Sequence, residues 1–274
     1  MDLFDHPVSY FDWLVIIRSE EKSENVVILE DRQMKELIKK QFSVDFNCPV
    51  EALDKNTFVT YKSDNRSRYR ARSKGSIVCY DGKVYVRTEE DRLTQKLKSK
   101  YNQKKSDWFL EIKNLQELKA ELAEFDLKIE SINPFFIPIK EKIITDNWNE
   151  RFVFIKKEDI PNFKENKRIT EAFCYSENDP DQIGLAYYEG NELKAICGAN
   201  WNGKYTWEIG IEVLDHQFEK QGIATELVRG LTSKILFDQP NVLIVYSTSF
   251  SHINSMNVAI NSGFKIGWTE ITFN

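Results

Sequence analysis

The sequence has 274 residues, a mass of 32.2 kDa and 41% hydrophobic residues, enough apolar side chain for packed cores, so global disorder is not expected. Its formal net charge of −5 gives no general attraction to phosphate backbones, so nucleic acid is not expected as a main partner. The four cysteines include no CxxC pair and the three histidines are isolated, so we expect no metal site.

Cellular location follows from what the apolar segments lack. No apolar run reaches the roughly 18 residues that a bilayer-spanning helix needs. The first residues, MDLFDHPVSYFDWLVIIRSEE, have no basic leader and do not read as a signal peptide. We therefore expect a cytoplasmic protein with reduced thiols and no membrane partner. The oligomeric state stays open, with a homodimer among the options.

The first half predicts a small α/β lobe. Residues 76–88, SIVCYDGKVYVRT, indicate two strands joined by a DG turn, and a charged helix over about 89–101 should follow. Asn114 with Glu117 three residues on is typical of a capping box, so we expect the next helix to begin at Asn114. A proline-containing apolar segment then favours an extended strand, with a domain boundary between residues 145 and 146.

The second half opens with a polar, helix-like stretch around 158–176 and then predicts the order β-β-β-α-β-α-β. Period-two alternation and credible hairpin turns indicate the strands, and apolar residues recurring every four positions indicate the first of the two helices. The expected elements are strands over 183–190, 192–201, 205–214, 241–249 and 264–273, and helices ending near 237 and spanning about 254–263.

The turn EKQGIATELV, residues 219–228, runs directly into a helix. Helix N-termini carry unpaired N–H donors and the positive end of the helix dipole, so they attract phosphate. Gly222 lets an anion approach the main chain closely, and the small Ala224 leaves the amides uncovered. From this motif alone, an ordinary helix start explains the residues about as well as a phosphate site does.

A wider pattern distinguishes the two readings. The residues Gly222-Ile223-Ala224-Thr225, preceded by the strand WEIGIEVL and followed by VYSTSFSHINSMNVAINSGF, resemble the GNAT superfamily of acetyl-CoA-dependent N-acetyltransferases, in particular its two-lobe bacterial type. The resemblance covers roughly residues 183–270. It implies a mixed α/β (α+β) protein in which residues 1–145 form a smaller N-terminal lobe of unassigned role and residues 146–274 form a GNAT domain with splayed central strands.

The resemblance also implies where acetyl-CoA binds. In the family this loop reads Arg/Gln-x-x-Gly-x-Gly/Ala, and here the first position is Glu219, which removes a side-chain contact and adds a negative charge. Main-chain amides would then have to carry the pyrophosphate with the help of a lysine. The expected cofactor-binding residues of the loop are Lys220, Gln221, Gly222, Ile223, Ala224 and Thr225.

Further along, the family carries Asn-x-x-Ser/Ala before an apolar helix. The asparagine position falls on His252, with Asn254 as a substitute, and Ser255 matches. Many relatives place a tyrosine four residues before the final glycine as general acid, but this chain has Ala259 there. Tyr246 and Ser255 remain as candidates for protonating the leaving thiolate.

Acetyl transfer to an amine needs a base, because an amine of pKa near 10.4 is protonated at pH 7. Alternation in the strand TWEIGIEV puts Glu208 and Glu212 on one face, and the resemblance places a base near Glu208. A solvated or salt-bridged face is the alternative for both. The resemblance also places a main-chain N–H near Ile211 to Val213 on the thioester oxygen.

An arginine-rich run, YKSDNRSRYRARSKG at 61–75, offers a different function. On an extended chain its alternating arginines would line one face and could grip phosphate, an acidic substrate or RNA, although a solvated or salt-bridged surface suits an acidic protein better. The leading expectation is direct acetyl transfer from acetyl-CoA to a small-molecule or peptide amine, with Glu208, Glu212 and Tyr246 as catalytic candidates. A non-catalytic CoA or metabolite sensor is the alternative.

Overall fold

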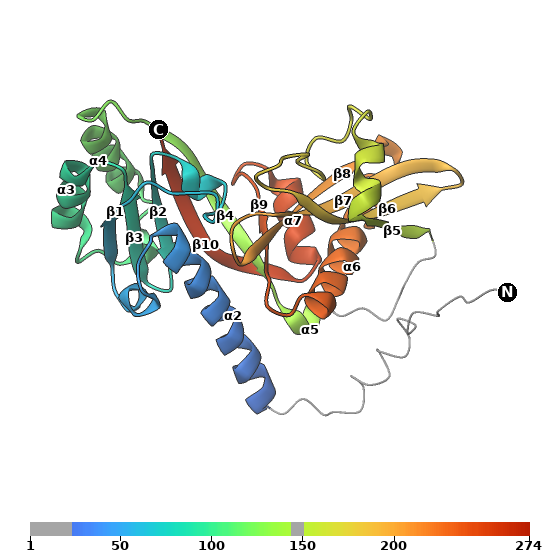
Figure 1. Cartoon of the computed structure of the whole chain (residues 1–274), viewed down its shortest axis with the longest axis horizontal. Coiled ribbons are helices and arrows are strands. Elements are labelled where there is room, and N and C mark those ends of the chain that lie inside the picture. Colours follow the sequence, from blue (N-terminus) through green and yellow to red (C-terminus); the bar gives the residue numbers. More distant parts are fainter. Residues whose placement is uncertain (1–23, 144–150) are drawn as a thin grey trace. The chain divides into compact units, whose positions relative to one another are not determined.

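The computed structural model describes residues 24–143 and 151–274 (Figure 1). The chain divides into two compact units, residues 1–36 and 37–274, and helix α2 (Glu24–Asp45) begins in the first. The sheet, the cores and the cleft described below lie in residues 37–274. The predicted boundary between residues 145 and 146 falls outside the described residues. None of the described helices is long and apolar enough to cross a bilayer.

One mixed sheet organises residues 37–274, with the order β1-β3-β2-β10-β4-β9-β8-β7-β6-β5. Strand β10 pairs with β2 on one edge and with β4 on the other, as Figure 1 shows. The expected mixed α/β class is therefore confirmed. The strands are β1 (Thr57–Thr60), β2 (Gly75–Tyr80), β3 (Lys83–Thr88), β4 (Ile129–Pro138), β5 (Phe152–Lys156), β6 (Asp181–Glu189), β7 (Glu192–Trp201), β8 (Thr206–Val213), β9 (Leu243–Ser247) and β10 (Phe264–Phe273).

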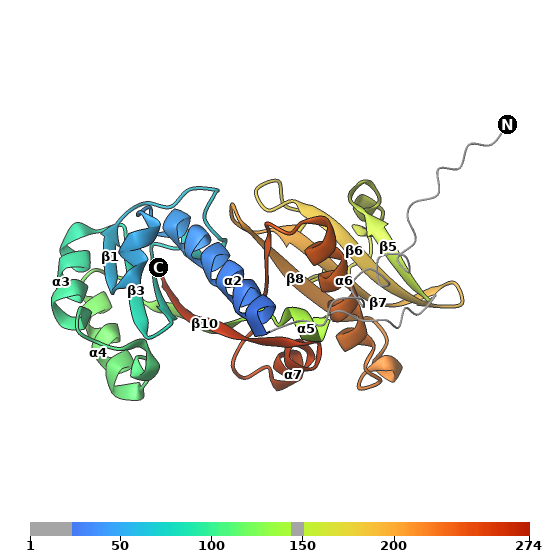
Figure 2. The same cartoon turned by 90° about the horizontal axis from the view of Figure 1, so that it is seen from below.

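The helices bury apolar faces against this sheet. Helix α3 packs on β1 and β3, and α6 packs on β6 and β7 (Figure 2). Leu93 and Leu97 of α3 join one buried cluster, whereas Leu227 and Leu231 of α6 join another. Besides α2, the described α-helices are α3 (Asp91–Tyr101), α4 (Ile112–Ala123), α5 (Lys140–Ile143), α6 (Ile223–Asp238) and α7 (Ile253–Asn261).

Most predicted elements are present at the expected positions, including the 76–88 hairpin and the β-β-β-α-β-α-β order. The predicted cap at Asn114 is wrong, because α4 begins at Ile112. Asn114 lies inside the first turn, where its side-chain amide donates to the carbonyl of Trp108 at 2.8 Å. Its side chain thus fastens the preceding segment instead of starting the helix.

The helix expected around 158–176 is also wrong. A 3₁₀ helix covers only Lys157–Phe163, and the chain that follows crosses the sheet without regular structure. Two strand glycines allow this close crossing: a Cβ at Gly198 would lie 1.9 Å from the carbonyl oxygen of Ala172, and one at Gly210 would lie 1.8 Å from that of Glu171. Contact between main chain and sheet therefore replaces helical hydrogen bonding here.

The arginine-rich run 61–75 does not form an extended strand with one charged face. Arg68 is 1% exposed, and its guanidinium binds Asp45 at 2.6 Å and Glu270 at 2.7 Å. Three rings surround it, those of Phe42, Phe135 and Trp268, each with its centroid 5.2–5.3 Å from the guanidinium carbon. The run therefore does not present one continuous arginine face. The favoured salt-bridged alternative holds for Arg66, Arg68 and Arg72, and Arg68 is buried as well.

Candidate functional site

The central strands β8 and β9 separate part-way along their length. They pair in parallel at only three positions, ending at Glu208 opposite Val245. Beyond that point β9 turns to β4, where Tyr246 and Ser247 find their partners. Strand β8 continues to Val213 with β7 on one side and, within the described residues, no strand on the other. The splayed central strands expected from the sequence are confirmed.

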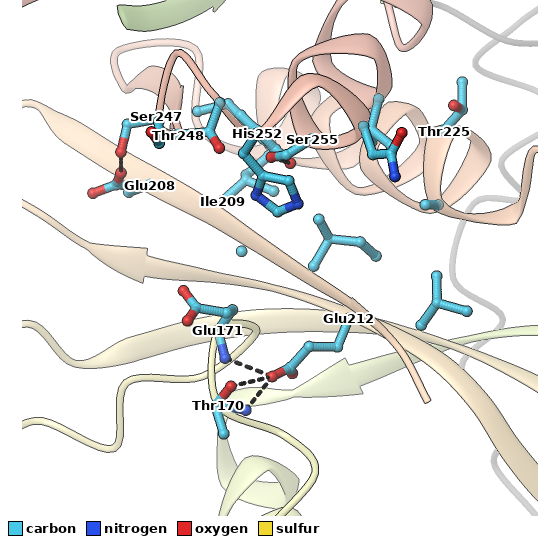
Figure 3. A pocket seen from close by; sticks show the side chains of 18 of the residues that line it. Thr170, Glu171, Glu208, Ile209, Glu212, Thr225, Ser247, Thr248, His252 and Ser255 are labelled. Atoms are coloured by element: carbon cyan, nitrogen blue, oxygen red, sulfur yellow. Dashed lines mark hydrogen bonds between the residues drawn. The ribbon is translucent and has the colours of Figure 1, made fainter. Parts of the chain in front are cut away.

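A cleft of about 1250 Å³ opens where the strands part. Its walls come from β8, from the end of β9, from the loop before α6, and from the beginning of α7. Figure 3 shows side chains from these elements around one gap, with Glu208 and Ser247 at one side and Thr225 at the other. The segments around Tyr69 and Thr170 complete the lining. The cleft therefore brings a carboxylate region and the start of a helix into one continuous space.

The start of α6 offers unpaired main-chain donors to this cleft. The first helical hydrogen bond runs from the N–H of Glu226 to the carbonyl of Gly222. The N–H groups of Ile223, Ala224 and Thr225 precede it and have no hydrogen-bond partner among the described residues. Gly222 has φ of +85° and open space where a Cβ would stand. An anion can thus reach the helix start without steric obstruction.

The negative charge of Glu219 in this loop is partly offset by two neighbouring basic residues. The side chain of Glu219 is hydrogen-bonded to Nδ1 of His216, on the 3₁₀ turn His216–Phe218 that precedes it. This hydrogen bond, with the attraction of the Glu219 charge, raises the pKa of His216 above its usual value. Lys220, which also lines the cleft, adds a cation from the left-handed region at φ of 63°. The loop therefore carries basic groups beside its carboxylate.

Glu208 lies at the point where β8 and β9 part. One of its carboxylate oxygens accepts from the hydroxyl of Ser247 on β9, and the other accepts from the side-chain amide of Asn202. Figure 3 shows the Ser247 contact. Asn202 is 2% exposed and is itself held, since its Oδ1 accepts from the main-chain N–H of Tyr69 at 2.6 Å. These contacts fix the carboxylate at the edge of the cleft.

Glu212 has a different set of partners, although it lies on the same strand face. Its carboxylate accepts from the N–H and hydroxyl of Thr170 and from the N–H of Glu171 at 2.7 Å, as Figure 3 shows. It also accepts from the N–H of Ala172 at 3.3 Å. In a helix over residues 170–172, these main-chain N–H groups would have donated to carbonyls of the same helix. Here they donate to the Glu212 carboxylate instead. Glu212 therefore holds the crossing segment on the sheet, and this geometry sets it apart from Glu208.

Tyr246 points its hydroxyl toward α7, where it lies 2.8 Å from Oγ of Ser255. Its ring is 3% exposed and packs edge-on against Phe136 and Phe264. Burial raises the pKa of Tyr246 to about 12. The hydroxyl thus stays protonated at neutral pH and can donate a hydrogen bond or a proton. Ala259, the position at which the resembled family often has tyrosine, is fully buried and faces no ligand space.

Most of the residues proposed from sequence line this single cleft. Gln221 does not, because its side-chain amide turns back to the carbonyl of Gln217 at 2.6 Å. Their roles in binding and catalysis stay predictions. The sequence-proposed residues that the cleft brings together are Glu208, Ile211, Glu212, Val213, Lys220, Gly222, Ile223, Ala224, Thr225, Tyr246, Asn254 and Ser255.

The cleft lining also includes charged or ionisable residues that were not among the proposed site residues, among them Arg70, Glu171 and His252. Figure 3 shows Glu171 and His252 projecting from opposite walls. Within residues 37–143 and 151–274, no group donates a hydrogen bond to the Glu171 carboxylate. Glu171 lies in the segment mistaken for a helix, so no sequence periodicity could have placed it here. His252 carried a signal, since it occupies the family's asparagine position.

Comparison with known proteins gives structural matches only. No protein-family profile matches the chain, and no curated protein does. A putative GNAT-family acetyltransferase from Novosphingobium aromaticivorans is 13% identical over 54% of this chain and 66% of its own, with a TM-score of 0.40. A GNAT-family acetyltransferase from Colwellia psychrerythraea is 11% identical over 54% of this chain and 57% of its own, with a TM-score of 0.38. A GCN5-related N-acetyltransferase-like protein from Streptococcus suis is 10% identical over 89% of this chain and 99% of its own, with a TM-score of 0.44.

The chain thus spans less than two thirds of the first two of these structures. At such identities and TM-scores, the role of the cleft has to be inferred from its own residues. These three solved structures are described as GNAT-family or GNAT-like acetyltransferases, and the likeness of this chain to them is a likeness of fold only.

Proposed function

We propose that this protein transfers an acetyl group from acetyl-CoA to an amine, directly and within a ternary complex. The observation that carries the proposal is the arrangement of the cleft. Unpaired amides of Ile223 to Thr225 lie at one part of it, the free edge of β8 runs along it, and Glu208 stands where β8 and β9 part. A diphosphate, an extended amide-containing arm and an amine would each meet a suitable partner there.

The helix start would hold the diphosphate, because its N–H groups and dipole favour anions. The free edge of β8 would hold the pantetheine arm by main-chain hydrogen bonds, as an added strand would. An N–H in the Ile211–Val213 part of that edge would stabilise the negative charge that develops on the thioester oxygen. Asn254 and Ser255, at the start of α7, would contact the same arm from the other wall.

Glu208 would take a proton from the acceptor ammonium, which frees the nitrogen lone pair for attack on the thioester carbon. The new N–C bond forms as the C–S bond breaks. Tyr246, whose hydroxyl is protonated at neutral pH, would then give its proton to the departing sulfur, and the second proton lost by the new amide nitrogen would restore the Tyr246 hydroxyl. Glu212 has no step in this scheme; it keeps the segment 170–172 in place.

The alternative is a CoA-binding sensor without turnover. It is favoured by Glu219 in the loop and by Ala259 at the position of the family's usual acid. Calorimetry with CoA and acetyl-CoA, followed by thiol release with a panel of primary amines, separates these functions. Amine-dependent release supports the transferase. CoA binding without such release over the whole panel supports the sensor, and no affinity for either compound rejects both.

The variant Gly222→Ala tests the phosphate site. It places a methyl group in the open space beside the unpaired amides, so we expect CoA to bind at least about tenfold more weakly. Gly190→Ala is the matched control, because Gly190 also has positive φ (+59°) and open space, but lies in the β6–β7 turn outside the cleft. Both variants should lose about 1–2 kcal/mol of stability. Equal CoA affinity in the two variants would contradict the assignment.

His216 should make CoA binding depend on pH. Its pKa is raised by Glu219, so its positive charge is present at low pH and is lost as the pH rises through that raised value. The phosphate monoester of CoA ionises in the same range, with a second pKa of about 6, so only the difference in CoA affinity between the parent and a variant is informative. We expect His216→Gln to bind CoA roughly two- to fivefold more weakly than the parent at pH 6 and equally at pH 9. Calorimetry at both values measures this, and a constant ratio would refute it.

A further inference from the structure

Arg70 lines the cleft but has no part in the proposed acetyl transfer. It opens the 3₁₀ helix Arg70–Arg72, within the arginine-rich run 61–75. Of the four arginines in that run, Arg70 is the one that lines the cleft. Arg70 therefore borders the space in which an acceptor would have to bind.

The arginines of this run differ in their partners. Arg66 binds Asp64 at 2.7 Å, Arg68 binds two buried carboxylates, and Arg72 binds Asp179 at 2.5 Å. Arg70 alone among the four has no carboxylate within 4 Å in the described part of the chain. The positive charge of Arg70 is therefore available to a bound anion in the cleft.

The contacts that Arg70 does make are neutral and hold its guanidinium in place. Nη1 lies 2.9 Å from Oδ1 of Asn133 when the Asn133 amide is oriented to satisfy both of its ends, and 3.5 Å from Oγ of Ser131. The same amide then donates to the carbonyl of Thr248, a residue of the cleft wall. These contacts engage Nη1. The Nε and Nη2 donors of Arg70 have no hydrogen-bond partner among the described residues.

Arg70 is also tied to the catalytic region of the cleft. The N–H of its neighbour Tyr69 donates to Asn202, and the amide of Asn202 donates to Glu208. Two hydrogen bonds thus connect the main chain beside Arg70 with the proposed base. The phosphate loop, at residues 218–225, is a separate part of the lining. A molecule whose amine is at Glu208 can therefore present another group to Arg70.

We infer that the acceptor is a primary amine that also carries a carboxylate. The inference rests on the proposed function, since it takes Glu208 as the site of the amine. The planar guanidinium fork matches a carboxylate with two parallel hydrogen bonds, and such charged pairs are stronger than neutral ones. The acidic wall formed by Glu208 and Glu171 would receive the ammonium, and Arg70 would receive the opposite charge.

Binding to the CoA complex tests this without requiring turnover. CoA is titrated first, and then the saturated complex is titrated with glycine, β-alanine and γ-aminobutyrate, each compared with its primary amide. Phosphoethanolamine against ethanolamine forms a second arm. We expect at least one carboxylate to bind about 10- to 100-fold more tightly than its amide, as hydrogen bonds to a charged group imply. Arg70→Gln should remove this preference, and Arg70→Lys should keep part of it.

Lys74→Gln is the matched control, because it removes a positive charge from the same run at an exposed position outside the cleft. It should leave the preference unchanged. A protein that binds CoA but shows no preference for carboxylates, or keeps the preference in Arg70→Gln, overturns the inference. A preference for phosphoethanolamine alone overturns the carboxylate assignment. Failure of the proposed function would appear earlier, as absence of CoA binding in the first titration.

Discussion

Replacing Glu208 by Gln is expected to lower kcat for acetyl transfer by about 10²-fold or more, with little change in CoA affinity. A positioned base contributes roughly 10²- to 10⁴-fold to such a reaction. Gln keeps the shape of the side chain, can still accept from Asn202, and can donate to the Ser247 hydroxyl. The substitution therefore removes the proton acceptor while the cleft is preserved. Steady-state thiol release, with CoA affinity from calorimetry, measures the effect.

The pH profile separates a lost base from a disturbed cleft. Without a base, only amine that is already deprotonated reacts, so the rate of Glu208→Gln should rise about tenfold per pH unit toward the amine pKa near 10.4. Glu158→Gln, at an exposed position of the 3₁₀ helix after β5, is the charge-matched control and should behave like the parent. A Glu208→Gln variant with full kcat would remove Glu208 from the mechanism. Glu171, whose carboxylate lines the same cleft and accepts no hydrogen bond from the described residues, would then be tested next.

Replacing Arg68 by Met is expected to lower the free energy of unfolding by about 3–5 kcal/mol. The change keeps most of the apolar stem but leaves Asp45 and Glu270 as buried carboxylates without their cation. It also removes the guanidinium from the three surrounding rings. Urea denaturation followed by far-UV circular dichroism gives the value.

Arg66→Met, two residues away, removes an exposed ion pair and serves as the comparison for the buried pairs of Arg68. Its partner Asp64 and its own side chain are exposed, so we expect a loss of only about 0–1 kcal/mol. Adding Glu270→Gln to Arg68→Met should restore part of the lost stability, because it removes one of the two unpaired buried charges. Similar losses in Arg66→Met and Arg68→Met would show that burial does not set the strength of these pairs.

Local patterns in the sequence were sufficient for the elements around the cleft. Alternation located β6, β7 and β8, and the turn containing Gly222 indicated that a helix follows it, as α6 does from Ile223. These features depend on side-chain period and on turn chemistry, both of which are written in neighbouring residues. The splay of β8 from β9 came from the family resemblance, since no periodicity reports which strand edges stay unpaired.

The remaining features depend on contacts between residues far apart in the chain. The segment 164–176 is polar enough for a helix, but Glu212 and the bare surface of Gly198 and Gly210 draw its main chain onto the sheet. Likewise, nothing near Arg68 indicates that Asp45 and Glu270 will enclose it. Such tertiary contacts override local preference. They brought Glu171 into the cleft without a sequence signal, whereas Arg70 belongs to the run 61–75 that the sequence analysis singled out, although nothing in the sequence placed it at this cleft.

The position of β10 governs when the sheet can be completed during synthesis. Residues 264–273 fill the gap between β2 and β4, whose pairing edges leave the ribosome well over a hundred residues earlier. Until β10 has been made, β1, β3 and β2 can pair only with each other, and the edges of β2 and β4 that β10 will cover remain unpaired. Slow elongation would lengthen this stage, so the nascent chain should need protection of these edges for longer than a protein whose strands pair in order of synthesis.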